Sequence, residues 1–178
     1  CLVLSAVGKD FSSYETALKK MGVNLKVLRD EKDYTATFYA MTDTKGEQIG
    51  VFQGGAYNNN VSSLSIAKLL SLKEIQGLEY AIFAAGTAKS ILKQIKELKK
   101  LNKKVKIVFD PGQMLAIDFT KEILEDCLKN SDLVILNDVE CNFLHNHFGF
   151  DLRVIFSLGV TGLVETKGAD GSVFHERV

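Results

Sequence analysis

Apolar segments of strand length alternate with amphipathic segments of helix length through the second half of the chain, and this alternation limits the fold more than any other feature. The expected strands are 80–84, 105–109, 133–136 and 162–166, and the expected helices between them are 88–101, 120–128 and 139–147. Strands separated by helices favour right-handed βαβ crossovers and a parallel sheet. The sequence therefore predicts an α/β fold with a mainly parallel central sheet.

The apolar run 152–156 is ambiguous, because a short apolar run is typical of both a strand and a buried helix. Two parallel strands ending near residues 136 and 166 need a crossover between them, which favours a helix that Gly159 would cap. A final strand is expected at 172–175, after a turn at 168–171.

The first half of the chain predicts strands at 2–7 and 25–28, with a helix at 12–21 between them. Ser12 and Glu15 have the spacing of a capping box at the start of that helix. Residues 35–53 are expected to form a β hairpin that turns at Asp43-Thr44-Lys45-Gly46.

Composition predicts one domain over residues 1–178. The chain is 46% hydrophobic, which provides for a sizeable core. Lys plus Arg and Asp plus Glu both number 22, so no overall field favours nucleic acid or an acidic membrane surface. No apolar stretch approaches the roughly 18 residues of a membrane helix. Three cysteines without disulfide or zinc spacing favour a reduced, cytoplasmic protein.

Three polar clusters follow three successive strands of the predicted sheet. They begin at Asp110, Asn137 and Thr166. Ligands of open α/β sheets bind at the carboxyl ends of the strands, so the clusters are candidates for one binding site.

Asn137 and Glu140 flank the start of a predicted helix. Their amide and carboxylate oxygens suit Mg²⁺, which usually keeps part of its water shell. The alternative is that Asn137 or Asp138 caps the helix while Glu140 complements its dipole. The residues alone leave both readings open.

The other two clusters also have simpler alternatives. The hydroxyl of Thr166 beside Gly168 is suited to a phosphate, but Gly168 equally permits a plain turn. The segment from Asp110 to Gln113 offers an acceptor and an amide, although Pro111-Gly112 breaks structure by itself.

The order and spacing of the clusters resemble the ribokinase-like (PfkB) family of carbohydrate and nucleoside kinases. The matching tracts are Asp110-Pro-Gly-Gln113, Asn137-x-x-Glu140 and Thr166-x-Gly168, the last followed by Gly171-Ser172. In the front half, Val7-Gly-Lys-Asp10-Phe11, Thr35-Ala-Thr37 and Gly55-Ala56 resemble further family tracts, with Gly54 in place of a proline. The resemblance implies a three-layer ribokinase-like fold with a small hairpin lid over 35–53.

The resemblance also implies residue roles. Asn137 and Glu140 would organise Mg²⁺ and ATP, and Thr166 and Gly168 would border the nucleotide phosphates. Gln113 and Asp110 would face the acceptor, since a similar tract occurs in the adenosine and nucleoside kinase-like subgroup; Met114 stands where some relatives have a second glutamine. Asp10 and Phe38 are further acceptor candidates, and Phe38 has the alternative of half-buried packing on the hairpin.

The implied function is phosphoryl transfer from ATP to a primary hydroxyl of a sugar or nucleoside, with an adenosine-like acceptor favoured and a homodimer as a predicted assembly. The family places a Gly-Gly-x-x-x-Asn segment before the first of these tracts and a Gly-Ala-Gly-Asp segment after the last one, and neither lies at that place within residues 1–178. No catalytic residue is therefore assigned, the catalytic Asp is expected beyond Val178, and the chain alone is predicted to be inactive. The alternative is a non-catalytic nucleotide-binding or regulatory protein derived from the kinase fold.

Overall fold

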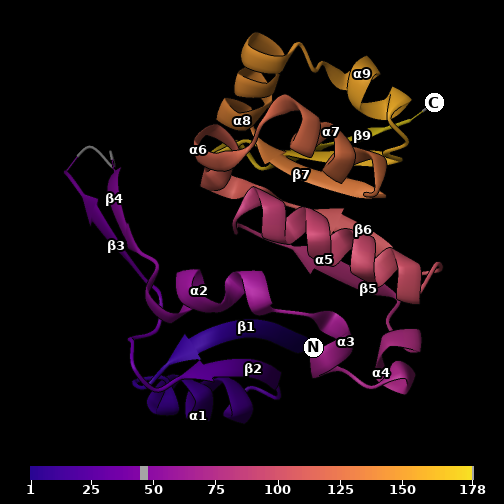
Figure 1. Cartoon of the computed structure of the whole chain (residues 1–178). Coiled ribbons are helices and arrows are strands. Elements are labelled where there is room, and N and C mark those ends of the chain that lie inside the picture. Colours follow the sequence, from indigo (N-terminus) through magenta and orange to yellow (C-terminus); the bar gives the residue numbers. More distant parts are fainter. Residues whose placement is uncertain (45–47, 178) are drawn as a thin grey trace. The chain divides into compact units, whose positions relative to one another are not determined.

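The chain divides into two compact units in the computed structural model, which describes residues 1–44 and 48–177 (Figure 1). The N-terminal unit is Cys1–Leu70 and the C-terminal unit is Ser71–Val178. Each unit is described by itself below. The sequence-based expectation of one domain over 1–178 stays a prediction.

The N-terminal unit contains two small sheets and short helices. Its elements are β1 Leu2–Gly8, α1 Ser12–Lys20, β2 Asn24–Asp30, β3 Thr37–Thr42, β4 Gln48–Gln53, α2 Gly55–Asn60, the 3-10 turn η1 Val61–Ser63 and α3 Ile66–Leu69. Strands β1 and β2 are connected through α1 and pair in parallel. Strands β3 and β4 pair in an antiparallel hairpin. The predicted strands and hairpin are confirmed.

The predicted capping box at the start of α1 is wrong. The helix is capped by Phe11 without a side-chain hydrogen bond. The Glu15 carboxylate instead pairs with Arg29 on β2 and with Lys19 one turn along the helix. Two cations at suitable distances outweigh a single backbone N–H as partners for an exposed carboxylate.

The hairpin exposes apolar side chains on both faces. Phe38 and Phe52 are cross-strand neighbours on one face, and Tyr39 and Val51 on the other, and all four are exposed. Lys45 and Gly46 of the predicted turn lie outside the described residues. The hairpin therefore contributes little to a core of the N-terminal unit.

The C-terminal unit is built on one five-stranded sheet in the order β5-β6-β7-β8-β9. Its elements are α4 Leu72–Gln76, β5 Tyr80–Phe83, α5 Ala88–Leu101, β6 Lys106–Phe109, η2 Gly112–Met114, α6 Leu115–Asp118, α7 Lys121–Lys129, β7 Leu133–Asn137, α8 Asp138–Phe143, the π-helical turn η3 Leu144–Phe148, α9 Leu152–Ser157, β8 Gly162–Thr166, η4 Gly168–Asp170 and β9 Ser172–Glu176. Four strands are parallel and β9 is antiparallel to β8. The predicted α/β class with a mainly parallel sheet is confirmed, as is the helix at the ambiguous run 152–156.

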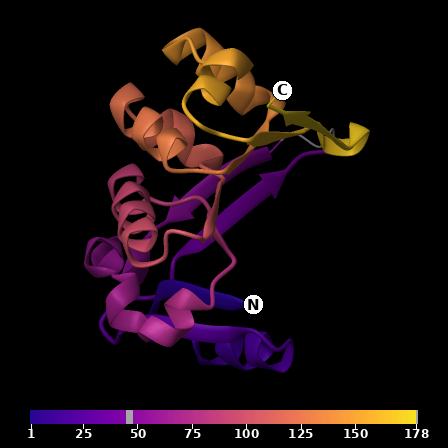
Figure 2. The same ribbon diagram turned by 90° about the vertical axis from the view of Figure 1, so that its right-hand side faces the viewer.

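The core of this unit lies between the sheet and the helices that cross over it. Sequential parallel strands joined by right-handed crossovers place the connecting helices on the same face, and α5 and α7 lie side by side along the sheet (Figures 1 and 2). Alternate strand side chains point to these helices and are fully buried, among them Ile107, Phe109 and Leu163. The opposite face leaves Tyr80 and Ile82 exposed on the edge strand β5.

None of the helices within residues 1–44 and 48–177 combines the length and the apolar character needed to cross a membrane. The helix α5 has 14 residues and carries several lysines.

Candidate functional site

The carboxyl ends of β6, β7 and β8 bring the three predicted polar clusters together in the C-terminal unit. Asn137 at the end of β7 is the register partner of Thr166 at the end of β8. Asp110 directly follows β6, and its backbone N–H donates to the carbonyl of Phe83 at the end of β5 at 2.9 Å. Residues far apart in the sequence thus line one edge of the sheet, as the parallel fold requires.

Asn137 and Glu140 form a reciprocal capping box at the start of α8. The Asn137 Oδ1 atom accepts from the backbone N–H of Glu140 at 2.7 Å, and Glu140 Oε2 accepts from the backbone N–H of Asn137 at 2.8 Å. The capping alternative raised by the sequence is thus present in the structure. It also fixes the Glu140 carboxylate at the strand end, so capping and ligand binding are compatible.

Two carboxyl groups meet at this edge in a partly dehydrated setting. Burial raises the pKa of Glu140, although the Asn137 N–H lowers it, and the nearby Asp110 charge raises it further. Burial likewise raises the pKa of Asp110, against a lowering contribution from the Gly112 N–H. Half-buried carboxylates of this kind would be stabilised by a cation bound beside them.

These residues fit Mg²⁺ as partial ligands. Within residues 1–44 and 48–177 no group of three or more His, Cys, Asp and Glu residues is arranged to hold a metal by itself. Mg²⁺ commonly binds through one or two carboxylates, water and substrate phosphates, so a closed protein cage is not required. Glu140 and Asp110 supply the carboxylates in this arrangement.

Thr166 and Gly168 lie at the other side of the same edge. Thr166 is half-buried, and Gly168 has a left-handed backbone with φ +56° and begins the 3-10 turn η4. The turn is closed by the Lys167 N–H, which donates to the Gly171 carbonyl at 2.8 Å. The turn alternative is therefore realised, and it leaves Gly168 exposed next to the strand end.

The segment that begins at Asp110 continues directly into the short 3-10 turn η2, which includes Gln113. Gly112 has φ +55°, and a β-carbon at this position would lie 3.2 Å from the Ala85 side chain. Only glycine satisfies both the backbone conformation and this close approach. The turn leaves Gln113 exposed beside the strand ends.

Asp10 lies in the N-terminal unit, where its carboxylate is bonded to Thr35. Asp10 Oδ1 accepts from the Thr35 backbone N–H at 2.7 Å and from the Thr35 hydroxyl at 2.8 Å. These bonds, the backbone N–H first, lower the pKa of Asp10. The Gly8 N–H donates to the same hydroxyl at 3.0 Å, so Thr35 joins the two family-like tracts.

Thr35 is the residue that sequence reasoning passed over as a site candidate. The Gly55-Ala56 tract is bonded to the residue before Thr35. The Ala56 N–H donates to the Tyr34 carbonyl at 2.8 Å. A hydroxyl that follows Asp10 by 25 residues gives no local signal, and only the fold pairs the two residues.

Phe38 is also in the N-terminal unit, on β3. Its side chain is 48% exposed, and its ring lies over Gly50, where a β-carbon would approach the ring to 2.5 Å. The packing alternative is thus partly realised, and a large part of the ring stays accessible.

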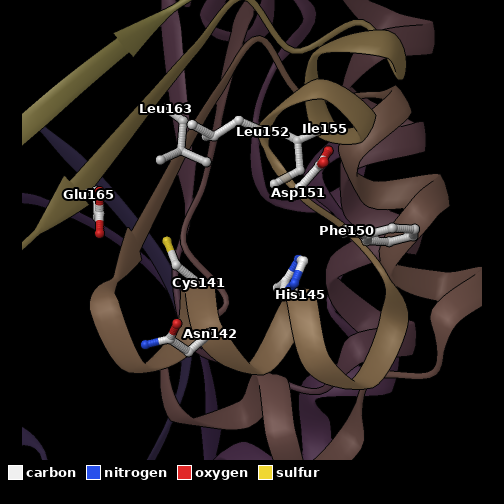
Figure 3. Close-up of a pocket in the computed structure, with 9 residues that line it drawn as sticks. All are labelled: Cys141, Asn142, His145, Phe150, Asp151, Leu152, Ile155, Leu163 and Glu165. Atoms are coloured by element: carbon white, nitrogen blue, oxygen red, sulfur yellow. The ribbon is translucent and has the colours of Figure 1, made fainter.

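A separate cavity of about 240 Å³ lies between α8, α9 and β8 and includes none of the predicted site residues (Figure 3). Figure 3 shows the Cys141 sulfur pointing into it. Burial, with smaller contributions from Glu165, Glu140 and Asp138, raises the pKa of Cys141 to about 11. The thiol is therefore protonated near neutral pH, which disfavours a nucleophilic role.

The fold and the strand-end cluster together define an α/β protein with a candidate ligand-binding edge at the carboxyl ends of parallel strands. A sequence profile described as "pfkB family carbohydrate kinase" matches residues 2–178. The chain therefore belongs to the PfkB family of carbohydrate kinases, as the sequence motifs predict.

Solved structures with the same fold include two nucleoside kinases. The Methanocaldococcus jannaschii nucleoside kinase, an archaeal member of the ribokinase family, is 27% identical with a TM-score of 0.83, over 99% of this chain and 56% of that chain. The Burkholderia thailandensis nucleoside kinase in complex with inosine is 24% identical with a TM-score of 0.81, over 98% of this chain and 55% of that one.

A ribokinase from Giardia lamblia is also similar in fold, at 18% identity and a TM-score of 0.77, over 98% of this chain and 56% of that chain. The chain thus spans a little over half the length of these structures. Comparison with curated proteins gives no match.

Proposed function

We propose that this chain is part of an ATP-dependent kinase that phosphorylates a primary hydroxyl of a nucleoside or sugar, with an adenosine-like nucleoside as the favoured acceptor. The observation that carries the proposal is the register pairing of Asn137 with Thr166, at the strand ends that also carry the half-buried carboxyl groups of Glu140 and Asp110. Family membership supports the reaction class. Inosine in the Burkholderia structure supports a nucleoside acceptor.

The proposed roles follow from placement along the sheet edge. Glu140 and Asn137, fixed by their capping box, would hold Mg²⁺ with the aid of Asp110. Bound Mg²⁺ would neutralise the phosphate charge that builds up during phosphoryl transfer. Thr166 and the exposed turn at Gly168 would offer hydroxyl and backbone N–H donors to the nucleotide phosphates.

The acceptor is assigned to the residues beside this nucleotide edge. Gln113 presents an amide from the turn after β6, and an amide both donates and accepts hydrogen bonds to sugar hydroxyls. Asp10 and Phe38 of the N-terminal unit are proposed as further acceptor contacts, with the Phe38 ring as a stacking surface for a base. A cytoplasmic location and a homodimer stay predictions.

Glu140→Gln tests the nucleotide site. The amide oxygen still accepts from the Asn137 N–H, so the helix cap survives, whereas the negative charge for Mg²⁺ is lost. In the full-length protein we expect turnover to fall by roughly a hundredfold or more. This is the size of effect that follows when one electrostatic contact to a transition state is removed. Stability should be unchanged or slightly higher near pH 7, because burial of the carboxylate is unfavourable.

Turnover is measured with ATP, Mg²⁺ and a panel of adenosine, inosine and ribose, and stability by urea unfolding. Asp138 is exposed and lies next to Asn137 in the sequence. Asp138→Asn therefore serves as the matched control. Full activity in Glu140→Gln would remove the proposed metal role.

A non-catalytic nucleotide binder derived from this fold is the second candidate. It is favoured by the capping box and the closed turn at Gly168, which are complete without any ligand. Calorimetric binding of Mg-ATP by the full-length protein, combined with no phosphorylated product from the acceptor panel, would favour this candidate over the kinase.

A further inference from the structure

The turn that carries Gln113 is fastened to a neighbouring turn by a carboxylate distant in sequence. Asp118 Oδ2 accepts a hydrogen bond from the backbone N–H of Ala88 at 2.6 Å, across a separation of 30 residues. Ala88 is the first residue of α5, and its cap residue Thr87 makes no side-chain cap hydrogen bond. Asp118 therefore supplies the acceptor that a helix usually takes from its own cap.

The charge of Asp118 suits this place. The N-terminus of the 14-residue helix α5 carries a partial positive charge, which attracts a carboxylate. No acidic residue lies in the first turn of α5 itself. The carboxylate that completes this helix start therefore comes from the end of α6.

Two further contacts attach the same segment to the turn after β5. The Asp110 N–H donates to the Phe83 carbonyl at 2.9 Å. Gly112 approaches Ala85 so closely that a β-carbon would lie 3.2 Å from its side chain. Segment 110–118 is thus bonded at its start through Asp110 and at its end through Asp118, and Gln113 lies between the two attachments.

We propose that Asp118 is a positioning residue for acceptor binding. By holding η2 and α6 against the start of α5, it sets where the exposed Gln113 amide stands relative to the sheet edge. The inference rests on the proposed function, in which Gln113 faces the acceptor. Asn137, Glu140 and Thr166 are placed by β7, β8 and α8 instead, so Asp118 should affect the acceptor and not the nucleotide.

The chain offers a matched control in Asp126. Asp126 is a half-exposed aspartate on α7. Its carboxylate pairs with Lys96 Nζ on α5 at 2.6 Å. Lys96 lies in the middle of α5, away from the strand ends. Asp126→Ala removes a carboxylate bonded to the same helix without touching the turn of Gln113.

Steady-state kinetics of the full-length protein test the inference, with inosine as the acceptor probe and with ATP. We expect Asp118→Ala to raise the KM for inosine about tenfold. A change of this size corresponds to the loss of about one hydrogen bond to a charged group. The KM for ATP should stay within about twofold of wild type. Asp118→Asn should recover most of the acceptor affinity, because its amide oxygen still accepts from Ala88. Asp126→Ala should behave like wild type.

Backbone hydrogen exchange gives a readout that does not depend on turnover. Asp118→Ala should speed exchange over residues 84–90 and 110–118, and Asp126→Ala should not. Gly112→Ala is a second route, because it disrupts the contact with Ala85 while leaving the Asp118 bond in place. It should likewise raise the KM for inosine, so a poorly folding Asp118→Ala does not end the test.

The outcomes separate the two levels of the argument. An active wild type whose inosine KM is unchanged in both Asp118→Ala and Gly112→Ala overturns the positioning role and leaves the proposed function standing. Equal increases in the KM values for ATP and inosine also overturn it, since they indicate a general structural role. A wild type that neither binds nor phosphorylates any acceptor of the panel overturns the proposed function, and the positioning role with it.

Discussion

The main sheet of the C-terminal unit and the hairpin of the N-terminal unit use apolar residues in opposite ways. In the C-terminal unit the strand residues Ile107 and Phe109 are fully buried beneath crossover helices. In the hairpin of the N-terminal unit the strand residues Ile49 and Phe52 are 69% and 52% exposed. A strand composition rich in β-branched and aromatic residues therefore predicts a strand in both places but not its burial. Burial depends on whether a helix covers the face.

This contrast extends to polar residues. In the C-terminal unit, Asn102 is buried and makes three side-chain hydrogen bonds within the protein, whereas in the N-terminal unit Asn59 is exposed and donates to the Asp33 carboxylate. The site residues follow the same division. On the sheet edge, Asp110 and Glu140 are half-buried and have raised pKa values, whereas Asp10 and Phe38 in the N-terminal unit are exposed.

The largest expected effect compares one substitution in the two settings. Ile107→Ala should lower the free energy of unfolding by about 2 to 5 kcal/mol, because it opens a cavity in a closed core. Ile49→Ala, on the exposed hairpin, should stay within about 0.5 kcal/mol of wild type. Urea unfolding followed by circular dichroism measures both. A hairpin substitution as damaging as the core one would show that the face around Ile49 is buried in the protein in solution.

A smaller effect is expected for the buried amide. Asn102 Nδ2 donates to the carbonyls of Ile75 and Leu78 at 2.8 and 3.0 Å, and its Oδ1 accepts from the Lys104 N–H at 3.0 Å. Asn102→Ala leaves these backbone groups without partners, so unfolding should become easier by about 1 to 3 kcal/mol. Asn59→Ala is the matched control and should change stability by less than about 0.5 kcal/mol. Similar losses for the two variants would contradict the division between the units.

The smallest effect is a dependence on pH. Burial raises the pKa of Asp132, but bonds from Lys99, the Ile107 N–H and Lys106 outweigh it and hold the pKa below its ordinary value. A carboxyl group with a lowered folded-state pKa stabilises the protein above the unfolded pKa of about 4, and this contribution is lost as the pH falls through the folded value.

Asp132→Asn should therefore be less stable than wild type by about 1 kcal/mol at neutral pH, and the difference should shrink below about pH 4. Urea unfolding between pH 3 and 7 measures this window. Asp10→Asn in the N-terminal unit provides the comparison, because Asp10 also has a lowered pKa but is fully exposed. A difference that stays constant with pH would remove the ionic contribution of Asp132.

Much of the fold was accessible from the sequence because its signals are local. The helix at 152–156 followed from a topological requirement, and the structure confirms it. A comparison of two pairs with capping-box spacing shows where local signals end. Asn137 with Glu140 forms the box, whereas Ser12 with Glu15 does not, because Arg29 on the neighbouring strand takes the Glu15 carboxylate. No pattern within residues 12–15 reports what a strand more than ten residues away will offer.

The candidate site divides in the same way. The sequence named Asp110, Asn137 and Thr166 by their position after strands, but their roles as ligands stay predictions. It did not indicate that Thr35 holds Asp10 or that Asp118 holds the start of α5. Both contacts join residues 25 to 30 positions apart, and neither leaves a periodic or compositional mark.

The sequence by itself determined the strands, the crossover helices of the main sheet, the parallel order of that sheet and the family. These depend on the alternation of polar and apolar residues, which acts through burial and is read over a few residues at a time. Only the tertiary structure decided which faces are covered, that Asn137 stands beside Thr166, and that the Glu140 and Asp110 carboxyl groups are half-buried. Such pairings depend on strand register and on the surroundings of each charge, and both exist only once distant segments have packed together.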